Sequence, residues 1–430
     1  MKLYSIARPI DLARVTALKF RKSMSEAADS YADLISPRLD RAFSEAIQGL
    51  AETAPDTPAT RAWVHTIRYL TQPGAREQPV PDAFSLGHVE ADGPDSGRLF
   101  ELLCWEGVGA CQLAASWDVE LPSAPPSLFS IGVEGAFVVG DPWPTSGRWR
   151  LSSGQDTSLI GPDFVGTSTS DLFWKPNVRV AGLGIDAFVP LNSMALMNRD
   201  FQEFPMVRSR GYSVTWAPVL KRAAEAIGDY SPLAAESVKE FVRCVVPLVG
   251  GNEVIGSASR EQALGLVFLP ASSRPDQLTE CLLHEAMHQY LFRIEECGAL
   301  FTNDTDDTDV NDRYYSPWRT DARPLRMTLH GAFVFAAVAD LYLWENAPQI
   351  FQLDRSECIR RAYHRAKQVQ QALGTVLSNA TLTGFGKIVV EAIAYDLAAV
   401  FDAAVPSNAD RAEVEAELTE HRERYVAYSR

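Results

Sequence analysis

The chain has 430 residues, of which 46% are hydrophobic and 22% are charged, and its formal net charge at pH 7 is −15. This length can bury a large core in two or three domains. The acidic balance argues against sequence-independent binding of nucleic acid, which depends on Lys and Arg neutralising phosphates. We find no secretory signal and no uncharged apolar run of membrane-spanning length, so we expect a soluble, cytoplasmic protein that keeps its six scattered cysteines reduced.

Helices are predicted at the start of the chain. Apolar residues recur at helical spacing over residues 10–53 and 58–71, and a Pro- and Gly-rich connection follows. In the next hundred residues, short apolar runs alternate with Pro, Gly and Ser, a pattern typical of antiparallel strands. We therefore predict an N-terminal helical region over residues 1–95 and a β-rich region over residues 96–210.

The rest of the chain, residues 211–430, is predicted to be a helical catalytic domain that binds a metal. A short apolar run at 263–269 is predicted to form a buried strand just before one of its helices. The fold class is therefore α+β, with a mostly helical C-terminal half. The helices predicted from apolar spacing cover residues 216–227, 233–246, 278–296, 330–344, 355–377, 385–401 and 411–428.

The most specific motif is His284-Glu285-Ala286-Met287-His288, within the predicted helix 278–296. Two histidines four residues apart lie on one face of a helix, where a single metal ion can bind both imidazoles. The glutamate between them can approach the open position of the metal and transfer protons. The motif therefore predicts a metal site but leaves the metal open.

A third protein ligand is expected, because metal sites of this kind use three. His330 is the first candidate, since it begins a second apolar helix that could cross the first. The rivals are acidic residues on or near the two helices, namely Asp340, Glu345, Glu295 and Glu296.

The segment 314–325 between these helices carries two arginines, Arg319 and Arg323, and two prolines that stiffen the backbone. Guanidinium binds carboxylate as a planar fork, so an arginine beside a metal suits a ligand that bears a carboxylate. The alternative is that both arginines pair with Asp321 or with the acidic loop 303–312. Two aromatic residues of the segment are predicted to contact substrate, Tyr315 and Trp318.

Three runs together resemble a known family: LTECLLHEAMHQYL, YYSPWRTDARPL and LHGAFVFAAVADLYLW. They are similar to the HEXXH-motif proteins found with ribosomally made, post-translationally modified peptides. The resemblance covers roughly residues 260–345. It implies a zincin-like fold and an Fe(II)- and 2-oxoglutarate-dependent peptide β-hydroxylase of RiPP biosynthesis, which acts on a precursor peptide. It also implies His284, His288 and His330 as iron ligands, and Arg319 or Arg323 as the anchor of the 2-oxoglutarate carboxylate.

Two other functions stay open. In a zinc metallopeptidase, Glu285 would act as general base on a zinc-bound water, but Ile294 stands where a metzincin has its third histidine. A binding scaffold with a vestigial site is the other alternative. Three histidines also differ from the two-histidine, one-carboxylate set usual for iron oxygenases, so Glu285 could be a base, an orienting residue or a weak ligand.

Overall fold

The computed structural model describes residues 3, 6–35, 61 and 64, short strands between 117 and 187, and residues 210–248, 256–302, 313–319 and 321–428. The chain forms two compact units, each built from separate segments. Unit 1 contains Met1–Thr16, Val219–Phe241 and Ser272–Arg430, and unit 2 contains Ala17–Pro218 and Val242–Ala271. The three predicted regions, 1–95, 96–210 and 211–430, stay a prediction, because much of the first two lies outside the described residues. The same holds for most of the predicted helix 58–71.

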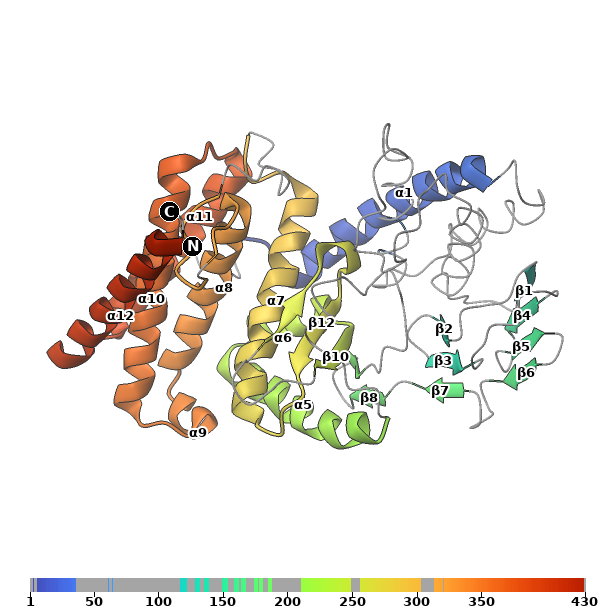
Figure 1. The fold of residues 1–430 in the computed structure, drawn as a ribbon, viewed down its shortest axis with the longest axis horizontal. Helices are drawn as coiled ribbons and strands as arrows, with labels where there is room; N and C mark the ends of the chain where they lie inside the picture. The colour runs from blue at the N-terminus through green and yellow to red at the C-terminus, as the bar shows by residue number, and fades with distance from the viewer. Residues whose placement is uncertain are drawn as a thin grey trace. The chain divides into compact units, whose positions relative to one another are not determined.

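Unit 2 contains two small antiparallel sheets, in the part of the chain where the sequence predicts antiparallel strands (Figure 1). One has the strand order β1-β4-β5-β6 and the other β2-β3-β7, and every pairing within them is antiparallel. The strands are β1 (Trp117–Leu121), β2 (Leu128–Ile131), β3 (Gly135–Val138), β4 (Trp149–Ser153), β5 (Ser158–Gly161), β6 (Phe164–Thr167) and β7 (Trp174–Pro176).

A third, mixed sheet in unit 2 has the order β11-β12-β10-β9-β8. Strand β10 runs parallel to β12 and β9, whereas β11 is antiparallel to β12. Every residue of β10 and β12 is buried, as expected for the apolar strands at the centre of such a sheet. The strands are β8 (Val178–Val180), β9 (Ile185–Ala187), β10 (Cys244–Leu248), β11 (Ala258–Ser259) and β12 (Leu266–Pro270), with a 3₁₀ turn, η6, at Glu261–Ala263.

One predicted helix is wrong at its C-terminal end, where strand β10 forms. The helix predicted over 233–246 ends at Phe241, and residues 244–248 form the strand instead. Pro247 lacks the N–H that a helix interior needs, and the β-branched Val245 and Val246 favour extended backbone. The carbonyl of Gly265 accepts hydrogen bonds from the backbone N–H groups of Arg243 and Cys244 at 2.8 and 2.9 Å, so the strand begins from a non-local contact.

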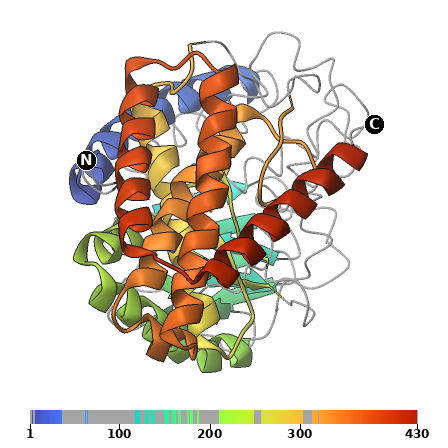
Figure 2. The same ribbon diagram turned by 90° about the vertical axis from the view of Figure 1, so that its left-hand side faces the viewer.

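Unit 1 is a helical assembly (Figure 2). Helix α8 is buried on most of its surface and packs against α7, α10 and α11, because its sequence is apolar nearly all round. The helices of unit 1 are α6 (Pro232–Phe241), α7 (Pro275–Cys297), α8 (Leu325–Leu343), α9 (Ala347–Phe351), α10 (Arg355–Asn379), α11 (Gly384–Ala403) and α12 (Asn408–Tyr428). Two further helices, α1 (Pro9–Ile35) and α5 (Arg210–Tyr230), contribute residues to both units.

Helix α7 carries the HExxH motif and follows β12 directly in the sequence, as predicted. Pro275 occupies its first turn, and the N-cap residue, Arg274, makes no side-chain cap. The Tyr290 ring stacks on Phe241 at 5.5 Å, and its hydroxyl donates to the Ala7 carbonyl at 2.5 Å. These contacts hold the centre of α7 within unit 1.

The sequence also led us to expect no membrane-spanning segment and reduced cysteines. In the described part of the chain, no helix combines the length and apolarity that crossing a membrane requires. None of the cysteines there takes part in a disulfide.

Candidate metal centre

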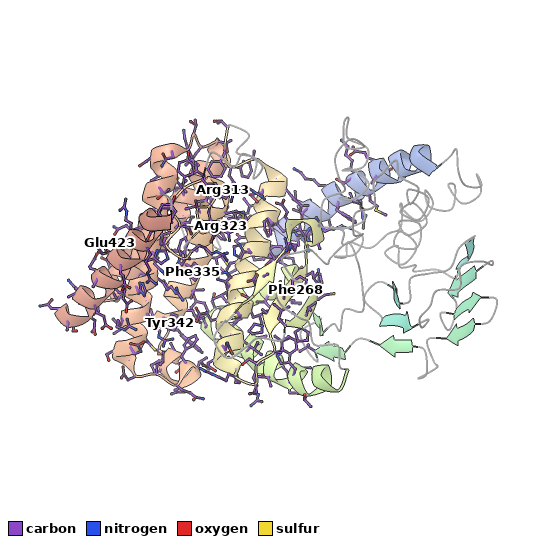
Figure 3. All side chains as sticks on the ribbon, viewed as in Figure 1. Phe268, Arg313, Arg323, Phe335, Tyr342 and Glu423 are labelled. Carbon is purple, nitrogen blue, oxygen red and sulfur yellow. The ribbon has the colours of Figure 1, made fainter. Side chains whose placement is uncertain are left out.

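The polar residues of the candidate site lie where α7 contacts α8. We call this region the seam, and it contains Glu280, His284, His288 and Glu295 of α7 and Arg326, His330 and Tyr342 of α8. These helices run antiparallel, because Glu295 near the end of α7 contacts the start of α8 whereas Glu280 contacts its end. The Tyr342 hydroxyl donates to Glu280 at 2.6 Å, and the His284 ring lies 4.9 Å from that of Phe335. Figure 3 labels Phe335 and Tyr342, both of which belong to α8. Glu280, His284 and His288 follow one another at four-residue spacing, so one face of α7 presents all three.

His288 and His330 meet at the middle of this seam. Their Nδ1 atoms are 3.3 Å apart, and the two rings are nearly parallel with centroids 5.6 Å apart. Two nitrogens bound at about 2.1 Å to one tetrahedral ion would lie about 3.4 Å apart. The spacing suits joint ligation of one metal, and it also suits a direct hydrogen bond between the two rings.

The other nitrogen of His330 is held by a carboxylate. Its Nε2 lies 3.0 Å from Glu295 Oε2, and Arg326 donates to the two Glu295 oxygens at 2.8 and 2.7 Å. Metal-binding histidines commonly donate their second N–H to a carboxylate, which fixes the tautomer and the ring orientation. The side chain of His330 is fully buried. Glu295, considered from the sequence as a rival ligand, lies on the far side of the His330 ring from His288.

His284 is the least constrained of the three predicted ligands. Its ring centroid lies 4.9 Å from that of His288, its side chain is 20% exposed, and its Nε2 is 3.9 Å from Glu285 Oε1. Among the described residues, no group of three His, Cys, Asp or Glu side chains is arranged to hold a metal ion. The donor types fit a metal, but the three side chains do not converge on one point in this structure.

Burial favours the neutral imidazole at two of the histidines, His284 and His288. Burial, assisted by Arg365, lowers the pKa of His284 to about 3. Burial also holds the pKa of His288 well below its ordinary value, with His284 and His330 lowering it further. Burial alone would raise the pKa of Glu295, but His330 and Arg326 outweigh it and hold that pKa at about 2. Neutral histidine is the form that binds metals.

These pKa shifts predict that the free energy of unfolding falls as the pH drops below about 6.5. The unfolded chain takes up protons at His284 and His288 that the folded protein excludes, so stability is lost on acidification. Glu295, with a pKa of about 2 rather than 4.5, adds a further loss below its ordinary pKa. Thermal unfolding midpoints measured with chelator between about pH 7.5 and pH 4 test this. A midpoint that stays constant or rises toward pH 4 would contradict it.

The two aromatic residues predicted to contact substrate, Trp318 and Tyr315, have different neighbours in the structure. The Trp318 ring stacks on Phe335 at 4.9 Å, and a Cβ at Gly331 would lie only 2.7 Å from the Trp318 ring. Trp318 therefore lies one ring away from His284. The Tyr315 hydroxyl is instead 3.0 Å from His421 Nδ1 on α12. A substrate contact by either residue stays a prediction.

The two predicted carboxylate anchors share an acidic partner. The Nε atoms of Arg319 and Arg323 lie 2.8 and 2.9 Å from the oxygens of Asp321, which is the alternative pairing raised by the sequence. The acidic loop 303–312 lies outside the described residues. Of the other rival ligands, Asp340 accepts from the Tyr230 hydroxyl at 2.6 Å.

Sequence reasoning missed three residues of this site. Glu280 stands four residues before His284, a spacing that could have placed it on the same face of α7. Phe335 looked like one of many apolar residues on its helix. Arg365 of α10 carried no sequence signal, because only the packing of α10 on α8 brings it near the seam.

The sequence matches no known family model, and no curated protein matches it. Assignment of a function therefore rests on the residues and contacts described above.

Proposed function

We propose that the chain is an Fe(II)- and 2-oxoglutarate-dependent oxygenase that hydroxylates a β-carbon in a ribosomally made precursor peptide. The observation that carries the proposal is the 3.3 Å spacing between the Nδ1 atoms of His288 and His330, with Glu295 supporting His330 from behind. His284, His288 and His330 would hold the metal. The strand β12 followed by the motif helix is also the local order of zincin-like folds.

The reaction assigns distinct tasks to the metal and the protein. Bound Fe(II) would activate O₂, so that 2-oxoglutarate is oxidised to succinate and CO₂ while one oxygen atom enters a C–H bond of the peptide. The three histidines would hold the ion, and Glu295 would orient the His330 ring through its Nε2. Phe335 and Trp318 provide an apolar wall beside His284. The net charge of −15 suits a cationic peptide.

A zinc metallopeptidase is the second candidate, and one observation favours it. Glu285 is 1% exposed and its Oε1 lies 3.9 Å from His284 Nε2. A carboxylate held beside a metal-binding nitrogen could take a proton from a zinc-bound water. A peptidase should therefore lose nearly all turnover in Glu285→Gln, whereas an oxygenase, in which Glu285 would orient or weakly bind the metal, should keep some.

The test needs no knowledge of the peptide. Loading the apoprotein with Fe(II) without O₂ and adding 2-oxoglutarate is expected to produce a visible charge-transfer band, because the keto acid chelates the iron. The band should disappear in His330→Ala and persist in His364→Ala, a histidine of α10 that pairs with Glu417 instead.

A different result would favour the zinc metallopeptidase. Absence of the band from the wild-type protein, together with tight retention of zinc, would contradict the oxygenase. Peptide-cleavage assays should then show activity that Glu285→Gln removes almost completely.

A further inference from the structure

We propose that α12 is a detachable strap, which holds the segment 314–325 in place while it is docked on α10 and frees the Tyr315 ring when it is released. The two helices and the segment all belong to unit 1. The opening of the strap does not depend on the function proposed above. Its consequence for a peptide substrate at Tyr315 does rest on that function.

Helix α12 buries little apolar surface. Among its described side chains, residues 408–425, only Val414 and Leu418 are fully buried. By contrast, α11 has seven buried residues, although it is one residue shorter. Elements with few buried apolar contacts open locally at a low cost in free energy. Helix α12 can therefore leave its place without unfolding of the other helices.

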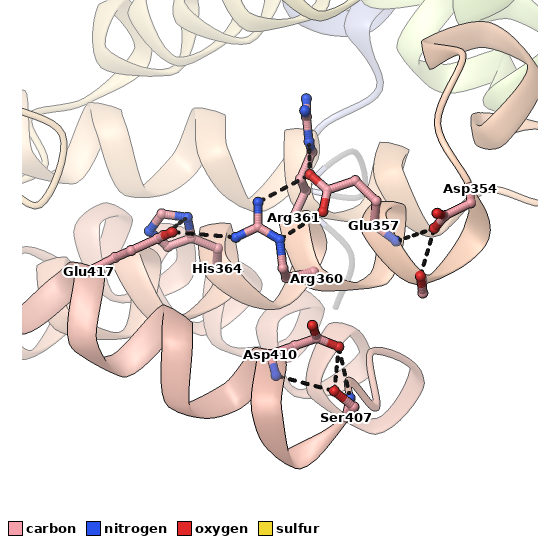
Figure 4. A network of polar contacts seen from close by, with 9 residues as sticks. Asp354, Glu357, Arg360, Arg361, His364, Ser407, Asp410 and Glu417 are labelled. Atoms are coloured by element: carbon pink, nitrogen blue, oxygen red, sulfur yellow. Dashed lines mark hydrogen bonds and ion pairs between the residues drawn. The ribbon is translucent and has the colours of Figure 1, made fainter.

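Polar contacts supply much of the attachment of α12 to α10. Glu417 lies 3.5 Å from Arg360 Nη1 and 3.4 Å from His364 Nδ1 (Figure 4). Lys367, one turn further along α10, pairs with Glu415 at 2.9 Å. Burial lowers the pKa of His364 to about 4, so at neutral pH Arg360 carries the charge that attracts Glu417. The two carboxylates are 40% and 51% exposed, so salt screens both pairs.

The last turns of α12 hold Tyr315 of the segment. The Tyr315 hydroxyl lies 3.0 Å from His421 Nδ1, and its ring meets that of Tyr425 edge-on, with centroids 5.1 Å apart. The guanidinium carbon of Arg422 lies 5.7 Å from the centroid of the Tyr315 ring. Because one helix provides all three contacts, release of α12 removes them together.

The segment connects this attachment to the candidate metal centre. Two backbone hydrogen bonds between Tyr314 and Arg323, at 2.7 and 2.9 Å, close it into a short loop. Within this loop, Tyr315 contacts α12, whereas Trp318 stacks on Phe335 beside the seam. Docked α12 therefore supports the loop on the side of Tyr315, and release of α12 removes that support.

The docked strap also occupies the groups of Tyr315 that a substrate would use. The hydroxyl is engaged by His421, and the ring is contacted by Tyr425 and Arg422. A peptide that binds to Tyr315, as the sequence predicts, must replace these residues. Under the function proposed above, docking of α12 and binding of the peptide therefore compete.

Amide hydrogen exchange of the full-length protein, followed by mass spectrometry, tests the strap. Glu417→Gln is expected to speed exchange about 2- to 5-fold in α12 and in the segment 314–325, the factor that loss of a partly exposed ion pair implies. Glu420→Gln removes the same charge from α12, but Glu420 pairs with Arg424 of its own helix at 3.8 Å, so neither region should change. Exchange in α7 should stay constant in both variants.

Salt provides a second measurement on the same peptides. Raising NaCl from about 0.05 M to about 0.5 M should speed exchange of both regions in the wild-type protein, with a smaller effect in Glu417→Gln.

Each alternative outcome has a distinct meaning. Unchanged exchange of α12 in Glu417→Gln and at high salt would overturn the strap. Faster exchange in α12 with an unchanged segment 314–325 would overturn its hold on Tyr315, and an equal increase in α7 would mean a general loss of stability instead. These measurements involve no metal or 2-oxoglutarate, so failure of the charge-transfer experiment would overturn the oxygenase and leave the strap standing.

Discussion

Replacing His330 by alanine is expected to lower the affinity for Fe(II), or for Co(II) as an air-stable substitute, by more than about 100-fold. Removing a residue that only supports a ligand typically costs 10- to 100-fold in metal affinity, and removing the ligand itself should cost more. His330 is fully buried and its Nδ1 faces that of His288 at 3.3 Å. Competition with a chelator of known affinity measures the change.

Glu295→Gln should give an intermediate loss of about 10- to 100-fold, because the amide keeps an oxygen near His330 but loses the charge. Glu296→Gln is the matched control, since this neighbouring carboxylate pairs with Arg293 at 3.3 Å instead. The order of effects, His330 above Glu295 above Glu296, distinguishes ligation from a general weakening of α7. Equal affinities across the three variants would mean that the seam binds no metal.

Gly386→Ala is expected to destabilise the protein by at least about 3 kcal/mol, the upper part of the range for overpacked sites. Gly386 lies in the first turn of α11, where its N–H donates to Thr383 Oγ1 at 3.1 Å. A Cβ there would lie far inside van der Waals contact of the Leu300 carbonyl oxygen and 3.0 Å from its carbon. Both are backbone atoms, so no side-chain rotation relieves the clash.

Gly384→Ala is the control within the same turn. A Cβ at Gly384 would meet no heavy atom within 4 Å. This variant should be neutral or more stable by up to about 1 kcal/mol, because alanine loses less backbone entropy on folding. Urea unfolding of both variants gives the two free energies. A loss at Gly386 no larger than the effect at Gly384 would contradict the close approach of α11 to Leu300.

Local patterns in the sequence predicted many of the helices of unit 1. The helices predicted over 278–296, 355–377 and 385–401 are observed as α7, α10 and α11 with ends that differ by a few residues. Helical periodicity and end signals act over one or two turns, so a sequence can report them. The same local geometry places His284 and His288 on one face of α7.

Tertiary structure decided which partners those residues meet. Glu295 supports His330 from 35 positions away, and Arg365 approaches Glu280 from 85 positions away. Such contacts follow from how α7, α8 and α10 pack, which depends on the shapes of whole helix faces. Strand β10 shows the same effect, because pairing with β12 extended a segment whose apolar run also suited a helix. Local sequence therefore specifies the motif and its helix. The packing of whole helices determines that Glu295 lies beside His330 and that Arg365 lies beside Glu280.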